Sequence, residues 1–414
     1  MLRRSLLALS VAAVACGAVV LGTSGSAGAA PPASTKGKTY VALGDSYAAG
    51  YQLPPPSVAT GQPVVGCDQT TGDYPHILAA QLGLKLTDVT CSGATTVDFT
   101  NSQDVTGTPD PAPQLDVFKK IQPDLVTITI GGNDLGFTSI AGACAATPPG
   151  DSTSRVIGNG KLGAGLLQYA TCRDYFSAPT SANGGKADNP YDKLPSVIAK
   201  VKAAVAAVQK AAPKAKVAVI AYPAIAPDAK NTPKGGCYTS LKQNADPTSM
   251  INPFPSALPF TDTDIPYLQV LQQRLDAGIG QAAQQLGASY ADIYPSSLSH
   301  SACQPESTRW VEPLTPDDGG LNVLHPNLRG TTAMADALNP VVRQLFAPVA
   351  APTTSSATTE PTTGTSATSG GASAAPLAAT GSRTPVGATV LLGTLLLAAG
   401  ASLLLVGRRA RRQH

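Results

Sequence analysis

Two side chains have the types that nucleophilic catalysis needs. Ser46 is the last residue of the tripeptide Gly44-Asp45-Ser46, which directly follows the apolar run Tyr40–Leu43. His325 lies almost 280 residues later in the chain. A serine hydroxyl is a poor nucleophile until a base removes its proton, and histidine is the usual base near neutral pH. The pair predicts covalent catalysis, although Ser46 taken alone is better explained as a helix cap.

Three other histidines compete for the role of base. His414 lies in the basic C-terminal tail, and His76 lies inside an expected helix, where a packing or surface role is expected. His300 stands in a serine-rich loop beside Cys303 and is the remaining competitor. His325 precedes a helix and is followed by proline, which favours a fixed backbone at that point.

Polar motifs also follow the next two apolar segments of the chain. Ser92-Gly93-Ala94-Thr95-Thr96 follows the first, Gly131-Gly132-Asn133-Asp134 follows the second, and Leu324-His325-Pro326-Asn327 precedes the last helix. Ligand sites of parallel sheets form beyond the carboxyl ends of the strands, so these motifs are expected to meet there. Asp134 is expected to cap the next helix, which would make Asn133 the functional member of its motif.

A second Gly-Asp-Ser, Gly150-Asp151-Ser152, shows that the tripeptide alone is weak. It follows Pro148-Pro149 rather than an apolar run, so it is expected to be a surface turn. The chain contains no Gly-x-Ser-x-Gly, which argues against the α/β-hydrolase nucleophile elbow.

In their order, the four motifs resemble the SGNH (GDSL) hydrolases, in particular their secreted actinobacterial lipase and esterase branch, from about Lys38 to Phe346. The resemblance implies that Ser46 is the nucleophile and His325 the base. It implies an oxyanion hole built from the N–H groups of Ser46 and Gly93 and the amide of Asn133. Gly93 suits that role because a residue without Cβ allows close approach of the substrate.

The resemblance also implies hydrolysis of carboxylic esters, with acyl lipids or other lipophilic small-molecule esters as substrates and with no metal or cofactor. One alternative within the enzymes is a carbohydrate deacetylase. Another, of a different class, is a wall-displayed binding protein on a catalytically dead scaffold, against which the retention of all four motif residues weighs.

One position departs from the family pattern. Many members place Asp three residues before the histidine, and here that position is Asn322. We therefore expect a backbone carbonyl, from Asn322 or else from Trp310, to orient His325. A carboxylate from Asp317 or Asp318 remains the alternative.

The elements that must position these residues alternate between strand and helix. Apolar, β-branched runs predict strands at 40–43, 85–91, 125–130, 216–222 and 288–293. Helical periodicity predicts helices at 73–82, 115–121, 191–211, 264–286 and 327–345. The alternation predicts a three-layer α/β/α fold with a central parallel sheet of about five strands, and the resemblance implies its flavodoxin-like SGNH form. The segments 52–72, 141–189 and 231–263 lack pattern and are expected to be loop insertions.

Cysteines indicate an exported protein. The chain has seven, and removal of an N-terminal leader with Cys16 leaves six. An even count favours disulfides. The chain has no C-x-x-C spacing, which argues against a zinc site. Fifteen pairings are open to six cysteines. We expect neighbours in sequence to pair and to pin the insertions: Cys67 with Cys91, Cys144 with Cys172, and Cys237 with Cys303.

The N-terminus carries a secretory signal, expected to occupy residues 1–29. Arg3 and Arg4 precede the apolar run Leu6–Leu21, and Ala27-Gly28-Ala29 fits a cleavage site. The alternative is a lipoprotein signal acylated at Cys16. The catalytic domain is then expected at 30–346, followed by a stalk at 347–376 that is rich in Ala, Thr, Ser and Pro.

Residues 377–414 resemble a sortase signal. Leu377-Ala378-Ala379-Thr380-Gly381 precedes the apolar run Val386–Val406, which is long enough to span a bilayer, and a basic tail follows. Basic residues stay in the cytoplasm, so the bulk of the chain is expected outside. The resemblance implies cleavage between Thr380 and Gly381 and attachment of Thr380 to peptidoglycan. A permanent single-span anchor is the alternative.

Charge excludes one class of partner. Only 13% of residues are charged and the formal net charge is +3, which leaves no footprint for nucleic acid. We expect a monomer.

Overall fold

The computed structural model describes residues 34–53, 66–105, 109–145, 170–179, 185–234, 236–237, 258–314 and 322–348. All of them belong to one compact unit, Met1–Ala351. The expected leader, most of the stalk, and the sorting motif with Thr380, Gly381 and the apolar run after it lie outside the described residues. No helix within those residues is both long enough and apolar enough to cross a membrane.

A five-stranded sheet runs through the described part of the chain, with every neighbouring pair parallel and the order β2-β1-β3-β4-β5. The strands are β1 (Thr39–Gly44), β2 (Lys85–Asp88), β3 (Leu125–Thr129), β4 (Lys216–Ile220) and β5 (Ser289–Ala291). Each expected strand is present; β1 extends one residue beyond its apolar run at each end, and the other four are shorter than theirs. The central β3 is buried at every residue, as a strand covered on both faces must be.

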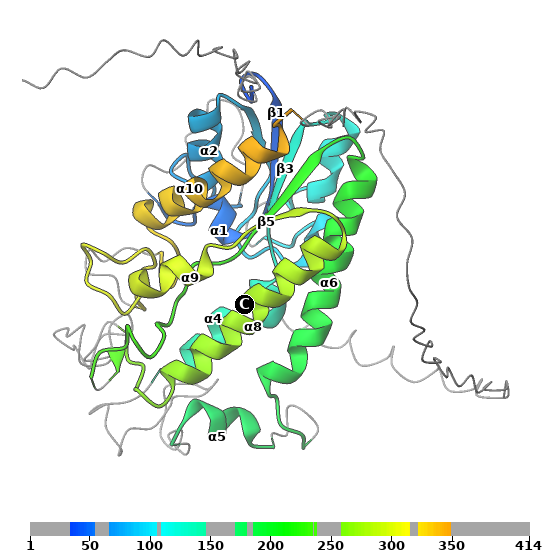
Figure 1. Ribbon diagram of the computed structural model, residues 1–414. Helices are drawn as coiled ribbons and strands as arrows, with labels where there is room; N and C mark the ends of the chain where they lie inside the picture. Colours follow the sequence, from blue (N-terminus) through cyan, green and yellow to red (C-terminus); the bar gives the residue numbers. More distant parts are fainter. Residues whose placement is uncertain are drawn as a thin grey trace, which may run out of the picture. The chain divides into compact units, whose positions relative to one another are not determined.

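Helices cover both faces of the sheet, as the alternating pattern predicts. The long ones are α2 (Tyr74–Leu82), α6 (Pro190–Ala211), α8 (Ile265–Gln285) and α10 (Leu328–Leu345). In Figure 1, α2 packs beside α10 on one face and α6 beside α8 on the other. The three-layer α/β/α fold is confirmed.

Short helices stand mainly at the carboxyl edge and in the insertions, and the sequence pattern did not predict most of them. They are α1 (Ser46–Ala49), α3 (Gly132–Leu135), α4 (Phe137–Ala143), α5 (Cys172–Ser177), α9 (Tyr294–Ser297) and the 3-10 turns η1 (Thr96–Phe99), η2 (Gln114–Lys119) and η4 (Leu298–His300). Segments of four to seven residues are too short for a helical period to register. The expectation of a patternless insertion at 141–189 is therefore wrong at α5, whereas 146–169 and 180–184 lie outside the described residues.

Three disulfides join Cys67 to Cys91, Cys144 to Cys172 and Cys237 to Cys303. These are the pairs expected between sequence neighbours. The first insertion is attached beside β2, because Cys91, the partner of Cys67, follows that strand. The second is attached beside α8, because the N–H of Cys172 donates to Asp264 at the start of that helix. Disulfides form in oxidising compartments, which fits secretion.

Candidate active site

The nucleophile turn joins β1 to α1. Gly44 ends the strand with a φ of +148°, and a Cβ there would stand 2.5 Å from the Thr129 carbonyl oxygen, so glycine is required where β1 and β3 approach. Asp45 is the N-cap of α1 and accepts a hydrogen bond from the Tyr47 N–H at 3.0 Å. Because Asp45 caps this helix, a capping role does not account for Ser46, the first residue of α1.

His325 contacts this serine. Its Nε2 lies 2.7 Å from Ser46 Oγ, and its Nδ1 lies 2.7 Å from the carbonyl oxygen of Val323. A carbonyl only accepts, so Nδ1 carries the proton and Nε2 is the acceptor. Ser46 Oγ–H therefore donates to Nε2, which is the arrangement for removal of the serine proton.

A backbone carbonyl orients His325, as expected, but it belongs to Val323 and not to Asn322 or Trp310. The Asn322 carbonyl accepts the N–H of His325 itself, and the Trp310 carbonyl accepts the N–H of Asn327. Both are thereby directed away from the ring. Leu324 has a φ of +58°, and the turn that it makes presents the Val323 carbonyl to Nδ1. Asp317 and Asp318 lie outside the described residues.

Enclosure of the imidazole disfavours its charged form. Desolvation lowers the pKa of His325 to about 4, and the hydrogen bond to Val323 opposes this shift without cancelling it. The neutral ring, which is the form able to accept the serine proton, is therefore the resting form at neutral pH.

Of the three expected oxyanion donors, Ser46 and Asn133 line one cavity, and Gly93 is not among the residues that line it. Asn133 lines the same cavity as Ser46 and His325, and one of its two amide hydrogens is used by the Ala94 carbonyl at 2.9 Å. Among the described residues, the backbone N–H groups of Ser46 and Gly93 have no acceptor. Pre-aimed donors of this kind stabilise the charge that develops in ester hydrolysis.

Gly93 is needed for its conformation. Its φ is +80°, in the left-handed region, whereas a Cβ would only meet Gln103 Nε2 at an ordinary 3.5 Å. The residues around it are tied to the other motif, because Asp134 accepts hydrogen bonds from Thr96 N and Thr96 Oγ1. Asp134 lies inside α3 and caps no helix, so the expectation of a cap is wrong. Its role is structural, because its carboxylate holds Thr96.

Three supporting residues were missed from the sequence. Tyr47 donates its hydroxyl to the Leu324 carbonyl at 2.6 Å and so ties α1 to the histidine loop. Gln114 bonds both the N–H and the carbonyl of Gly44, each at 2.9 Å. Tyr222 lies against Asp45 and Gly132. Tyr222 follows β4 at the carboxyl edge, a position that signals a site residue; Gln114 gives no such signal.

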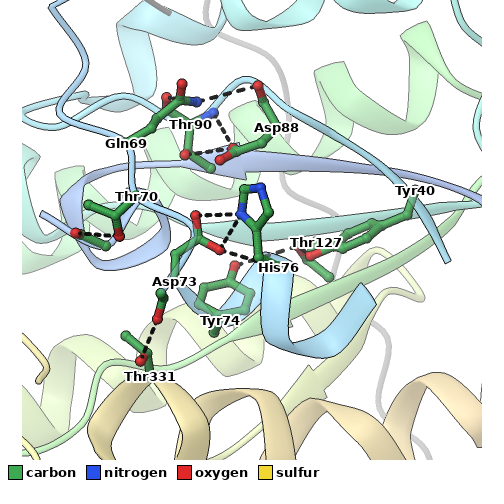
Figure 2. Close-up of polar contacts among 12 residues, drawn as sticks. Tyr40, Gln69, Thr70, Asp73, Tyr74, His76, Asp88, Thr90, Thr127 and Thr331 are labelled. Carbon is green, nitrogen blue, oxygen red and sulfur yellow. Dashed lines mark hydrogen bonds and ion pairs between the residues drawn. The ribbon is translucent and has the colours of Figure 1, made fainter. Parts of the chain in front are cut away.

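The other described histidines are held elsewhere. His300 stacks on Trp310 with ring centroids 4.2 Å apart, and its Nδ1 lies 2.7 Å from the Thr308 carbonyl oxygen. Figure 2 shows the His76 ring turned toward the carboxylate of Asp73, with Nδ1 2.8 and 2.9 Å from its two oxygens. Neither histidine lines the cavity at Ser46.

Asp73, His76 and Asp88 offer atoms of metal-binding type within 4.8 Å of one another. Hydrogen bonds already use most of these atoms: the Asp73 carboxylate caps α2 and holds His76, and Asp88 Oδ1 accepts from Thr90. None of the three lines the cavity beside Ser46. The cluster is thus explained as a capped helix terminus joined to the end of β2.

A cavity of about 30 Å³ opens beside Ser46. Its lining includes the polar side chains of Asn133, His325 and Tyr222 and the apolar side chains of Phe137 from α4, Ile225 from the segment after β4, and Leu275 from α8. An ester placed with its carbonyl at Ser46 would therefore have both hydrogen-bond donors and apolar side chains within the same cavity.

Comparison with known proteins agrees with this geometry. Residues 42–333 match the model of the GDSL-like Lipase/Acylhydrolase family. Lipase 2 of Streptomyces coelicolor is 36% identical over 80% of this chain and 95% of its own length. An esterase of Streptomyces scabiei is 28% identical over 82% and 95%. A solved extracellular lipase of Streptomyces rimosus is 21% identical over 74% of this chain and 99% of that one, with a TM-score of 0.47. The chain therefore belongs to the GDSL-like lipase and acylhydrolase family and is a carboxylic ester hydrolase.

Proposed function

We propose that the chain is an extracellular serine hydrolase that cleaves lipophilic carboxylic esters through an acyl-serine intermediate. The observation that carries the proposal is the 2.7 Å contact between Ser46 Oγ and His325 Nε2 in a cavity that apolar side chains also line. Such side chains suit an acyl chain, since burial of each CH₂ group contributes about 0.8 kcal/mol.

The proposed reaction has two halves. His325 Nε2 takes the Ser46 proton while Oγ attacks the ester carbonyl carbon, and the N–H groups of Ser46 and Gly93 and the Asn133 amide hold the oxyanion. The alkoxide leaves with the proton from His325, which forms the acyl-serine. A water then gives its proton to His325 and attacks the acyl carbon, and release of the acid returns the proton to Ser46.

Replacement of the nucleophile tests this mechanism. Ser46→Ala should abolish ester turnover and labelling by a fluorophosphonate, because loss of a nucleophile costs several orders of magnitude in rate. An unchanged melting temperature would show that the fold is intact. Labelling that survives and maps to Ser152 would refute the assignment.

Substrate class is tested with a panel of esters. Purified enzyme should hydrolyse nitrophenyl esters of medium acyl chains faster than acetylated sugars, because the apolar side chains of the cavity contact a longer acyl chain. The second candidate, a carbohydrate deacetylase, would use the same serine and histidine, and the polar side chains of the cavity could contact a sugar. Turnover of acetylated sugars with no activity on longer acyl esters would establish that alternative.

We also propose attachment to the cell wall at Thr380, on the strength of the sorting motif and the apolar run and basic tail that follow it. A sortase would cut the Thr380–Gly381 bond and transfer the chain to peptidoglycan. Deletion of Leu377–Gly381 should then move the protein from the wall fraction to the membrane fraction. An unchanged distribution would leave a permanent membrane anchor as the explanation.

A further inference from the structure

Tyr222 stands between the two turns on which catalysis depends. It follows β4, is 5% exposed, and meets the Tyr47 ring edge-on, with centroids 5.0 Å apart and an interplanar angle of 85°. Its hydroxyl donates to Asp45 Oδ2 at 2.5 Å and accepts from the Gly132 N–H at 3.0 Å. One oxygen atom thus binds the residue before Ser46 and the residue before Asn133.

Tyr222 is itself held by α8. Asp276 Oδ1 accepts the Tyr222 N–H at 3.0 Å, and the Gln272 amide bonds both the Pro223 carbonyl and the Ile225 N–H. Two side chains on successive turns of a long helix therefore fix the backbone of the Tyr222 segment. A hydroxyl on so fixed a ring has little freedom to follow either turn, so the turns must follow it.

We propose that Tyr222 is a positioning residue for ester hydrolysis, one that sets the place of the Asn133 amide relative to Ser46 Oγ through its bonds to Gly132 and Asp45. This inference rests on the proposed acyl-serine mechanism. On the far side, Asn133 and Asp134 bond to the Ala94 and Thr96 turn. The nucleophile turn, Tyr222, the Asn133 turn and the Gly93 turn thus form one connected network.

Electrostatics favour the same arrangement. Asp45 is 1% exposed, and burial raises its pKa to about 7, whereas the Tyr222 and Tyr47 hydrogen bonds oppose that rise. Loss of the phenol hydroxyl would leave Asp45 Oδ2 and the Gly132 N–H without this partner. The Asp45 pKa would then rise further, and the Gly132 backbone would be free to shift with Asn133.

Tyr222→Phe removes the hydroxyl and keeps the ring. We expect kcat to fall at least tenfold with a smaller change in KM, because the oxyanion donors act in the transition state. The matched control is Tyr294→Phe, which removes another buried tyrosine hydroxyl, bonded to the Gln269 carbonyl at 2.9 Å, away from the cavity. That variant should retain wild-type kcat.

A double-mutant cycle separates positioning from general damage. If Tyr222 acts through Asn133, Tyr222→Phe should cost little in an Asn133→Ala background. Rates are referred to sites titrated with fluorophosphonate, so that misfolded enzyme does not count. If Tyr222→Phe fails to fold, Asp45→Asn in the same cycle removes the charge that accepts the phenol and should show the same non-additivity.

Two results would overturn the inference: full activity in Tyr222→Phe, or losses that simply multiply in the double variant. Either result leaves the acyl-serine mechanism standing, since that mechanism fails only if Ser46→Ala still turns over or is still labelled.

Discussion

His325 suits the proposed role of base because its surroundings keep it neutral. Burial lowers its pKa to about 4, and the Val323 carbonyl fixes the proton on Nδ1. A carbonyl carries only a partial charge, so it sets the tautomer without stabilising the imidazolium as a carboxylate would. His325 therefore stays neutral, and able to accept a proton, far into the acid range, although it is a weaker base than an ordinary histidine.

The pH profile should show this directly. With a pKa of about 4, roughly nine-tenths of His325 is neutral at pH 5, against roughly 3% for a histidine with the ordinary value of 6.5. We expect the acid limb of kcat/KM to fall below pH 5. His300→Ala serves as the control and should leave the limb in place. A limb centred near pH 6.5 would contradict the enclosed, uncharged ring.

Asp317 and Asp318, which precede His325 by eight and seven residues in the sequence, should matter little. Val323 already occupies Nδ1, so Asp317→Asn and Asp318→Asn should each retain activity within about tenfold, and Asn322→Ala should do the same because its backbone remains. Steady-state kinetics on folded protein measures this. A thousandfold loss in either Asp variant would restore a Ser-His-Asp triad.

At the scale of elements, the loop that carries His325 is braced by a buried ion pair. Arg309 is 2% exposed, and its guanidinium lies 2.6 Å from Glu312 Oε2. Glu312 in turn exchanges backbone hydrogen bonds with Leu324 and His325, and its other oxygen accepts from Asn327. The base is thus held from both sides of its turn.

Glu312→Gln should loosen this brace. Replacing a charged acceptor beside a buried guanidinium should lower the free energy of unfolding by roughly 1.5–3 kcal/mol. Activity should fall as well, because the turn positions Nε2. Lys193→Ala breaks an exposed pair with Asp188 and should cost at most about 1 kcal/mol in urea unfolding. Equal effects of the two changes would mean that the loop is held by other contacts.

The sequence predicts elements best where one residue pattern decides the structure. The strand 125–130 and the helix 327–345 appear within one or two residues of their expected bounds, because burial on two faces and a capping Asn327 leave a clear pattern. The Ser46 turn was located for the same reason. Gln114 was missed because its partner, the backbone of Gly44, lies 70 positions away and no local pattern marks it. Tyr222 follows a strand end, which is a local signal, but its bond to Asp45, 177 positions away, depends on the sheet order.

At the scale of the whole molecule, the order of strands creates the site. The chain passes from β1 outward to β2 and then to β3 on the other side of β1, so the order of connection reverses between β1 and β3 while all strands stay parallel. At such a switch point the loops after the two strands diverge and leave a crevice. Ser46 follows β1 and Asn133 follows β3, so the crevice separates nucleophile from amide. Disulfides join the described cysteines of the three insertions to Cys91, Cys144 and Cys303.

The bridges should therefore differ in what they protect. Chain-entropy arguments give about 3.4 kcal/mol for the 24-residue separation of Cys67 and Cys91 and about 4.3 kcal/mol for the 66-residue separation of Cys237 and Cys303. Paired Cys→Ser variants, compared by urea unfolding, should rank in that order. The loss of kcat should instead be larger without the Cys67–Cys91 bridge than without the Cys237–Cys303 bridge. The Ser92 N–H bonds the Cys67 carbonyl, directly before the oxyanion residue Gly93, so loss of the first bridge should lower kcat. A first bridge that changes stability alone would show that the Gly93 turn is fixed by Asp134 and Thr96 without help from the disulfide.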